Sequence, residues 1–396
     1  MPNRFFFFLL VGSLSLTTAF AQSDFDFTAY DTYLQEEVAQ GHLAGAVSLV
    51  YKNGEVIHDA TYGYADREAE ETMAKDQVFH IMSMTKPLVT LAAMQLWEDG
   101  HFKLDDPIAD HLDGFTDLRV TKDPTAGKDG PSEPVRGPIT IRQLMTHTAG
   151  FSHGLGGSQL DREFGMAMYF MPQKDLASRV ATLTSFPLSV QPGTKWNYSA
   201  SPDVLALLVE KYSGVTMDSF LRARILEPLG MNNTGYNLPE PKAARLAKLY
   251  KTENGKLVRD MFQMPAAGNT VFGGSHGLVS TAPDYARFCA MLLNEGRFGD
   301  EQIIEPATLE LMQQNHLGDV PFAPGKGFAL GFGVVTETPA DGIGSPGTLF
   351  WSGYYNTFFF VDPVQDMFAI LMTQQSGSKR DHGAAMWKHV YGAVAK

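Results

Sequence analysis

Hydrophobic positions along this chain follow a strand-like pattern near both ends and a helix-like pattern between them. Two apolar runs near the start, Gly45–Tyr51 and Val56–Tyr64, flank the segment Lys52-Asn53-Gly54. Asn-Gly between two such runs is a strong signal for a β-hairpin. Three further strand-like runs lie near the end: Gly327–Glu337, Leu349–Asp362 and Phe368–Gln374. The pattern predicts strands at both ends of the chain.

Between these strands the apolar spacing is that of helices. A helix over Phe27–Gln40 is predicted to end at Gly41. The other predicted helices are Met84–Glu98, Ile141–Thr146, Pro202–Tyr212, Pro283–Asn294 and about His382–Val394. The segment Thr121–Pro138 is rich in glycine, proline and charged residues, so we expect a long exposed loop there.

Strands at both ends with helices between them predict an α+β fold. We expect the N- and C-terminal strands to form one antiparallel sheet flanked by the terminal helices. A mostly helical second lobe would face this sheet across a cleft. The predicted sheet lobe comprises about residues 27–75 and 325–396, and the predicted helical lobe about residues 76–324.

The composition narrows the class of protein. Of the 396 residues, 44% are hydrophobic and 19% are charged, which is ordinary for a globular chain and argues against disorder. The net charge of −13 argues against a nucleic-acid partner, which usually requires a basic surface. Cys289 is the only cysteine and lies in an apolar helical pattern, so we expect it in the core, with no intrachain disulfide.

The first residues have the features of an export signal. Arg4 precedes the apolar run Phe5–Leu14, and Ala19-Phe20-Ala21 matches the small-x-small cleavage pattern. An N-terminal anchor is the alternative, but the run is too short to span a bilayer. We expect cleavage after Ala21 and an exported protein, periplasmic or secreted, that comprises residues 22–396.

Ser83-Met84-Thr85-Lys86 is a Ser-x-x-Lys motif that Pro87 places at the start of a helix, because proline is tolerated where its missing N–H has no intrahelical partner. Residues 88–97 are apolar nearly all round, which is typical of a buried helix. Lys86 is then on the same face as Ser83, and burial lowers the pKa of a lysine so that it can accept a proton.

Further segments match the landmarks of a known family, in the same order. They are Phe79–Lys86, Leu104–Pro107, Ile141–Phe151, Trp196–Ser199, Gly277–Thr281 and Trp351–Gly353. On these motifs the chain, from about Tyr30 to Val390, resembles the class C β-lactamases, DD-peptidases and family VIII carboxylesterases, which share a β-lactamase/transpeptidase-like fold. The resemblance implies a serine hydrolase that forms an acyl-enzyme on Ser83.

The resemblance also implies roles around Ser83. Tyr198 would hydrogen-bond Ser83 and share the general-base work with Lys86, because a neighbouring ammonium favours the ionised phenol. The backbone N–H groups of Ser83 and Tyr354 would form the oxyanion hole. Substrate would be bound by Trp351, Ser352 and Gly353.

Two positions depart from the family pattern. Ala200 stands where the second motif has an asparagine that contacts a substrate amide, and Trp351 stands where the third motif has a lysine or histidine that faces a substrate carboxylate. A carboxylesterase acting on short or apolar acyl esters is therefore expected. The alternatives are β-lactamase, DD-peptidase or acyltransferase activity, or a catalytically idle protein that binds cell-wall peptides.

Several other motifs carry residue types that are common in active sites. Gly273–Gly277 matches the G-x-S-x-G nucleophile elbow, but no strand-helix pattern surrounds it. A second Ser-x-x-Lys, Ser376–Lys379, lies in a polar stretch and is predicted to be a surface loop. His147 is expected to be a buried hydrogen-bonding residue, and no ligand spacing indicates a metal or another cofactor. Phe164–Met171 is predicted either to wall an apolar acyl pocket or to pack in the core.

Overall fold

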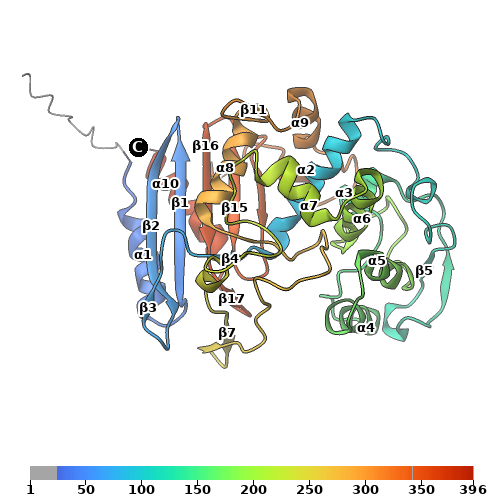
Figure 1. The fold of residues 1–396 in the computed structure, drawn as a ribbon, viewed down its shortest axis with the longest axis horizontal. Helices are drawn as coiled ribbons and strands as arrows, with labels where there is room; N and C mark the ends of the chain where they lie inside the picture. Colours follow the sequence, from blue (N-terminus) through green and yellow to red (C-terminus); the bar gives the residue numbers. More distant parts are fainter. Residues whose placement is uncertain (1–24, 341, 396) are drawn as a thin grey trace, which may run out of the picture.

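The computed structural model describes residues 25–340 and 342–395, so the predicted export signal lies outside the described residues. An eight-stranded antiparallel sheet with the order β12-β13-β14-β15-β16-β1-β2-β3 joins both ends of the chain (Figure 1). Its strands are β1 (Gly45–Lys52), β2 (Glu55–Asp66), β3 (Glu71–Thr72), β12 (Lys326–Phe328), β13 (Gly333–Val335), β14 (Leu349–Ser352), β15 (Phe358–Asp362) and β16 (Met367–Met372).

The predicted hairpin of β1 and β2 is confirmed. Its turn contains Asn53 and Gly54 with φ angles of 51° and 88°, a conformation that asparagine and glycine adopt at low cost. On its other edge β1 pairs with β16, so that Leu49 lies opposite Ile370. This pairing ties the N-terminal hairpin to the C-terminal strands.

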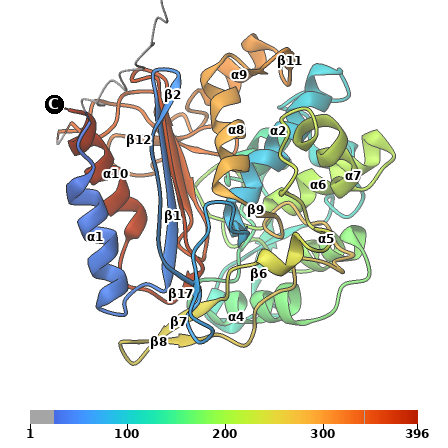
Figure 2. The ribbon, with the colours of Figure 1, turned by 60° about the vertical axis from the view of Figure 1, so that its left-hand side comes forward.

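The sheet is covered on both faces. The terminal helices α1 (Thr28–Ala39) and α10 (His382–Val394) lie together on one face, and α8 (Ala282–Leu293) lies on the other (Figure 2). Successive side chains of β1 point to opposite faces of the sheet. Ala46 and Val50 belong to the core under α1 and α10, whereas Val47 and Leu49 belong to the larger core on the α8 side. The α+β prediction is confirmed.

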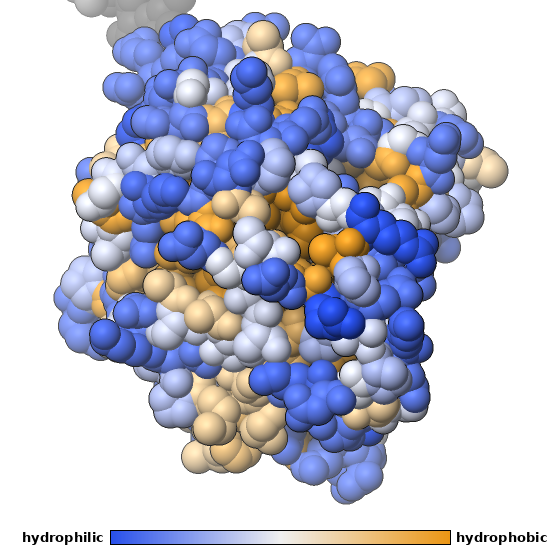
Figure 3. Space-filling model, turned by 90° about the vertical axis from the view of Figure 1, so that its right-hand side faces the viewer, coloured by the Kyte–Doolittle hydropathy of each residue, from blue (hydrophilic) through white to orange (hydrophobic). Residues whose placement is uncertain are grey.

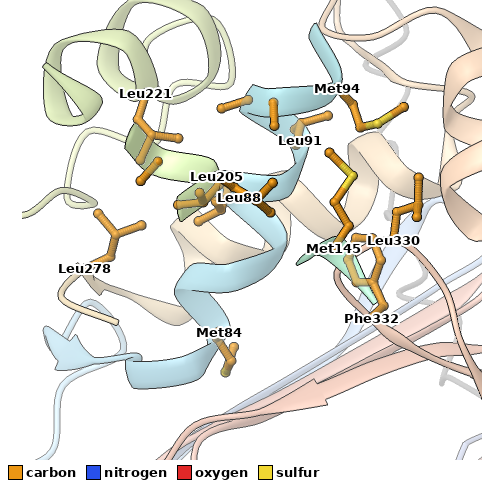
Figure 4. Close-up of a cluster of buried hydrophobic side chains, with 14 of the residues drawn as sticks. Met84, Leu88, Leu91, Met94, Met145, Leu205, Leu221, Leu278, Leu330 and Phe332 are labelled. Carbon is orange, nitrogen blue, oxygen red and sulfur yellow. The ribbon is translucent and has the colours of Figure 1, made fainter. Parts of the chain in front are cut away.

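Helix α2 (Thr85–Glu98) runs through the centre of the larger core. Every residue from Thr85 to Leu96 is buried. Figure 4 shows Leu88, Leu91 and Met94 of this helix among side chains from distant parts of the chain: Met145, Leu205, Leu221, Leu278, Leu330 and Phe332. A helix that is apolar on all sides requires this enclosure, as its sequence predicted. Cys289 is also buried in this core.

The remaining α-helices are α3 (Ile141–Met145), α4 (Gln159–Gly165), α5 (Leu176–Thr184), α6 (Ser201–Ser213), α7 (Met217–Leu221) and α9 (Pro306–Gln313). Of these, α6 and α7 pack directly against α2, and the others lie farther out. Short strands complete the fold: β4 (Phe79–His80), β5 (Arg119–Thr121), β6 (Ser132–Pro134), β7 (Tyr250–Glu253), β8 (Lys256–Arg259), β9 (Val279–Ser280), β10 (Arg297–Phe298), β11 (Glu301–Gln302) and β17 (Gln375–Ser376).

Three predicted segments differ from the structure. Gly327–Glu337 and Leu349–Asp362 were each expected to be one strand, but each contains a turn between two antiparallel strands. Gly331, with a φ of 89°, lies in the first turn, and residues 353–357 form the second. The expected loop Thr121–Pro138 instead contains β6, which pairs with β5.

The surface is mixed in character. On the face shown in Figure 3, hydrophilic residues predominate and apolar residues gather in patches toward the middle. Within the described part of the chain, none of the helices has the length and apolar character needed to cross a bilayer.

Candidate active site

Ser83 lies in a single 3₁₀ turn, Met82–Met84, directly before α2. Both sides of this turn are fixed by hydrogen bonds. The N–H of Ile81 donates to the carbonyl of Leu278 over 3.1 Å, and the hydroxyl of Tyr285 donates to the carbonyl of Met84 over 3.0 Å. The helix start that Pro87 predicted is therefore confirmed, with Ser83 at its N-terminal end.

Lys86 reaches Ser83 from the first turn of α2. Its Nζ lies 3.0 Å from Ser83 Oγ and donates to the carbonyl of Ser275 over 2.7 Å. The side chain is 1% exposed. Burial lowers the pKa of Lys86 to about 7, and the nearby charges of Asp203 and Arg179 act in opposite directions. An amine with this pKa is available as a neutral proton acceptor near pH 7.

Tyr198 contacts Ser83 from the segment before α6. Its hydroxyl donates a 2.7 Å hydrogen bond to Ser83 Oγ, and Lys86 Nζ lies 4.8 Å from the centre of its ring. The expectation that a neighbouring ammonium would favour the ionised phenol is wrong. Burial is the largest effect and raises the pKa of Tyr198, so the group stays neutral and keeps its proton to donate.

The segment Gly273–Gly277 lies behind Lys86. It has no strand before Ser275 and no helix directly after it, so the prediction that it is not a nucleophile elbow is confirmed. Ser275 Oγ is buried without a hydrogen-bond partner among the described residues. What this residue contributes is its carbonyl, which accepts from Lys86.

A buried ion pair next to this segment was not anticipated from the sequence. Arg179 Nε in α5 donates to Asp203 Oδ2 in α6 over 2.7 Å, and Asp203 Oδ1 accepts from the N–H of Ser275 over 2.8 Å. Arg179 and Asp203 are 24 positions apart in the chain, so no local spacing relates them. An acidic residue in the first turn of the apolar helix α6 is the one signal that sequence reading could have used.

The end of β14 closes the other side of Ser83. Trp351 packs against Tyr198 with ring centroids 5.6 Å apart. Its buried indole N–H makes no hydrogen bond of normal geometry among the described residues. A Cβ on Gly353 would overlap the carbonyl of Ile81 and the hydroxyl of Thr357. Glycine therefore allows this turn to lie directly against the turn that carries Ser83.

The two N–H groups expected in the oxyanion hole come from these two turns. Ser83 and Tyr354 both line the same cavity. The N–H of Gly353, in contrast, is used in a 2.8 Å bond to the carbonyl of Thr357.

A cavity of about 740 Å³ opens above Ser83. Its walls are largely aromatic and apolar, and they include Leu155, Met168, Phe170, Trp196, Leu249, Phe262, Met264, Trp351, Tyr354 and Tyr355. The segment Phe164–Met171 divides between the two roles considered for it. Phe164 is buried in the core, whereas Met168, Tyr169 and Phe170 line the cavity. Ser376 of the second Ser-x-x-Lys also lines it, but Lys379 is exposed.

Apolar side chains also surround the cavity mouth. Phe262 is 88% exposed and Phe170 is 75% exposed, and Leu155 and Tyr354 are more than half exposed. The neighbouring Met166, Met171 and Met261 are exposed as well. We call these seven residues the apolar rim.

The histidines near the site are neutral. His147 is buried with its Nδ1 3.1 Å from Ser199 Oγ, which confirms the expected hydrogen-bonding role. Burial lowers the pKa of His147 and His153 well below the usual value and that of His276 to about 3. Within the described residues, no group of three or more histidine, cysteine, aspartate or glutamate side chains could hold a metal ion.

Comparison with known proteins gives a consistent picture. The family model described as Beta-lactamase matches residues 30–392. The chain is 31% identical to Esterase EstB of Burkholderia gladioli over 367 residues, which cover 87% of this chain and 89% of that protein. It is 32% identical to an uncharacterised protein of Mycobacterium tuberculosis over 356 residues, covering 86% and 88%.

A solved structure shares the fold over nearly the whole chain. EstCE1, described as a hydrolase with promiscuous acyltransferase activity, superposes with a TM-score of 0.76 at 27% identity, covering 91% of this chain and 97% of that one.

Proposed function

This chain belongs to the beta-lactamase family and is a serine hydrolase, and from that premise we propose that it is a carboxylesterase whose nucleophile is Ser83. One observation carries the proposal. Ser83 Oγ lies 3.0 Å from Lys86 Nζ and 2.7 Å from the Tyr198 hydroxyl, and Ser83 lines a large, mostly apolar cavity. These are the distances at which a proton can be exchanged between the three groups.

Acylation begins with neutral Lys86. Its lone pair takes the proton of Ser83 as Oγ attacks the ester carbonyl and forms the tetrahedral intermediate. Collapse of this intermediate breaks the bond to the alcohol, which leaves with a proton delivered through Tyr198 and replaced from the Lys86 ammonium. The products of this step are the free alcohol, neutral Lys86 and an acyl group on Ser83.

Deacylation repeats the sequence with water as the nucleophile. Neutral Lys86 accepts a proton from the water as its oxygen attacks the acyl carbonyl. When the bond between the acyl group and Ser83 Oγ breaks, Tyr198 donates its proton to Oγ and is reprotonated by the Lys86 ammonium, and the carboxylic acid leaves. In both steps we propose that the N–H groups of Ser83 and Tyr354, two residues that line the same cavity, stabilise the negative oxygen, since backbone donors require no reorganisation to do so.

The substrate class follows from what the cavity offers. Its walls are mostly apolar, and its cation Arg179 is already paired with Asp203. A carboxylated substrate such as a β-lactam would therefore bury its charge without a partner, which is costly. Ala200 is fully buried and is not part of the cavity wall, so it offers no substrate contact either. We infer that neutral esters are favoured.

The size of the cavity indicates bulky apolar esters as well as short ones. An acetyl or butyryl group fills a small part of about 740 Å³, and the apolar rim extends the apolar surface outside the cavity. The burial of substrate carbon against this surface contributes about 25 cal/mol per Å². Acyl groups longer than butyryl would gain binding energy from it.

The nucleophile is tested by labelling with a fluorophosphonate probe and by activity on nitrophenyl butyrate. Ser83→Ala should lose labelling and reduce kcat by about 10³-fold or more, and Ser275→Ala should keep most of both. An active, unlabelled Ser83→Ala protein, or a folded but inactive Ser275→Ala protein, would contradict the assignment. A wild-type protein that neither reacts nor turns over would support the idle binding protein instead.

The substrate class is tested on one preparation with nitrophenyl butyrate and a chromogenic cephalosporin. The unpaired carboxylate should cost on the order of 2–3 kcal/mol, so kcat/KM should favour the ester by about 10²-fold. Equal efficiency on the cephalosporin would overturn this preference.

Acyl transfer is a second candidate activity. EstCE1 is described as a hydrolase with promiscuous acyltransferase activity, and the cavity has room for an alcohol acceptor beside an acyl group. Adding a primary alcohol during ester turnover should divert part of the acyl-enzyme to a new ester, measured by chromatography. A product mixture free of that ester would exclude this activity for the alcohol used.

A further inference from the structure

A buried chain of hydrogen bonds runs from Lys86 to α5. Lys86 Nζ donates to the carbonyl of Ser275 over 2.7 Å, and the N–H of Ser275 donates to Asp203 Oδ1 over 2.8 Å. Asp203 Oδ2 then accepts from Arg179 Nε over 2.7 Å. Asp203 is fully buried and Arg179 is 7% exposed. The proton transfers described above use neither of these two residues.

Stability alone does not account for this ion pair. Two charges taken out of water carry a desolvation cost that their attraction often fails to exceed, and apolar side chains of similar volume are commonly as stable or more stable. Neighbouring buried positions on the same helices, Val180 and Leu205, are apolar. An ion pair at this position, linked to Lys86 through the backbone of the single residue Ser275, points to a role in the site.

The position of the Ser275 backbone depends on close packing. A Cβ on Gly274 would overlap the carbonyl of Pro202, and a Cβ on Gly273 would lie 2.8 Å from Asp203 Oδ1. The two glycines therefore allow this segment to lie against the start of α6. In that position Asp203 binds the N–H of Ser275 while the carbonyl of Ser275 faces Lys86.

We propose that Asp203 and Arg179 are positioning residues for Lys86: by binding the N–H of Ser275, Asp203 fixes the backbone of this residue so that its carbonyl holds Nζ beside Ser83, and Arg179 holds Asp203 in place. The proposal rests on the proposed function in that it takes Lys86 as the proton acceptor. The ion pair then influences both the position of Nζ and the pKa of Lys86.

The ion pair also balances charge around Lys86. Asp203 raises the pKa of Lys86 and Arg179 lowers it. Because these two effects oppose each other, burial is the main influence on the pKa of Lys86. Among the described residues, the other titratable groups that interact with Lys86 are Tyr198, His147, His153 and His276, and burial keeps them neutral near pH 7. Removing the charge of Asp203 should therefore lower the pKa of Lys86, and removing the charge of Arg179 should raise it.

The test compares pH profiles of kcat/KM for two single variants. Neutral Lys86 is the active form in the proposed mechanism, so activity rises with pH through the pKa of Lys86. We call this rising part of the pH profile the acidic limb. Asp203→Asn keeps an oxygen for the N–H of Ser275 and removes the negative charge, so the acidic limb should move to lower pH. Arg179→Gln removes the positive charge, so the limb should move to higher pH. Each shift should be about half to one pH unit.

A matched control is the exposed pair Arg142–Asp105, whose Nε–Oδ1 distance is also 2.7 Å. Asp105→Asn should leave the acidic limb within about 0.2 pH unit of the wild-type limb. In the double variant Asp203→Asn/Arg179→Gln the two effects oppose each other, and the limb should return close to its wild-type position. Limbs that stay unmoved, or that move in the same direction in both single variants, would overturn the proposal.

Two measurements keep this test independent of folding failures. The variant Asp203→Leu/Arg179→Met leaves no unpaired charge, and it should fold but lose about 10²-fold in kcat with little change in KM. A fully active protein would overturn the positioning role. Titration of ¹³C-labelled lysine by NMR follows the Lys86 pKa directly, and it should show the same opposite shifts in the Ser83→Ala background.

The failures of the two proposals can be told apart. Retained activity in Ser83→Ala would refute the proposed function. A dead Ser83→Ala protein combined with unmoved limbs in Asp203→Asn and Arg179→Gln would refute the positioning role alone.

Discussion

Lys86 shows how burial changes the chemistry of one residue. A lysine in water is protonated at neutral pH, but full burial in α2 lowers the pKa of Lys86 to about 7. The same burial raises the pKa of Tyr198, so the two groups take different roles. In the proposed mechanism Lys86 accepts a proton and Tyr198 donates one. The site thus obtains an acid and a base from one desolvated environment.

The first prediction concerns Lys86→Met, which should abolish esterase activity and stabilise the fold. Below pH 7 the folded wild-type protein buries a charged lysine, and this cost is absent in the variant. As pH rises from 7 to about 10.5 only the unfolded state still binds the proton, so wild-type stability increases and the advantage of the variant shrinks.

Urea unfolding at pH 6 and pH 9 measures this. The variant should gain on the order of 1–3 kcal/mol at pH 6 and less at pH 9. A gain that grows with pH, or a destabilised variant at pH 6, would contradict a lowered Lys86 pKa.

At the scale of elements, the site is built where two short turns meet. The 3₁₀ turn Met82–Met84 precedes α2, and the turn after β14 lies against it at Gly353. Neither turn belongs to a regular element, but each is anchored by one. The buried helix α2 holds the first turn and the paired strands β14 and β15 hold the second.

The second prediction is that Gly353→Ala separates these turns. Its Cβ would overlap the Ile81 carbonyl and the Thr357 hydroxyl, so the turn after β14 must move away from Ser83. We expect kcat to fall by about 10²-fold, the size of effect seen when an oxyanion donor is lost, with a destabilisation of about 1–3 kcal/mol. Gly137→Ala is the control, because a Cβ there meets nothing within 4 Å. Wild-type kcat in Gly353→Ala would show that the turn is not part of the catalytic site.

At the scale of the whole molecule, the cavity draws on nearly the full length of the chain. Its wall includes residues from Met82 to Ser376. Segments that are far apart in the sequence therefore form one surface. The apolar rim comes from three such segments: the residues around α4, the loop after β8 and the turn after β14.

The third prediction tests the rim with esters of rising acyl length. Phe262→Ser should lower kcat/KM for a dodecanoyl ester by about tenfold, because about 1–2 kcal/mol of apolar contact is lost, and should change the acetyl ester by less than twofold. Val364→Ser is the control, since Val364 is 68% exposed and is not part of the cavity wall. A uniform loss across all acyl lengths would indicate a folding defect and not a contact with the acyl chain.

The fourth prediction concerns export, which we propose from the N-terminal sequence. The apolar run Phe5–Leu14 and the Ala19-Phe20-Ala21 pattern lead us to expect a mature N-terminus at Gln22. Mass spectrometry of protein recovered from outside the cytoplasm of its native host measures this. A mature protein that still carries residues 1–21 would refute cleavage.

Features that depend on local rules could be predicted from the amino-acid sequence. Pro87 marked the start of α2, Asn53-Gly54 marked the first hairpin, and apolar periodicity located α6 and α8. The contact of Ser83 with Lys86 followed from helix geometry, because side chains three positions apart share a face. The family resemblance led to Tyr198, whose bond to Ser83 the structure contains.

Features that depend on neighbours distant in sequence could not be predicted in this way and emerge from the packing of the folded chain. The protonation of Tyr198 was misjudged because burial, set by surrounding side chains, outweighs the nearby amine. The pairing of Arg179 with Asp203 and the assembly of the apolar rim join segments with no local relation. The segment Leu349–Asp362 is two antiparallel strands and not one, and Gly353 in the turn between them lies against Ile81. Desolvation and close packing act through space, so local sequence patterns do not encode them.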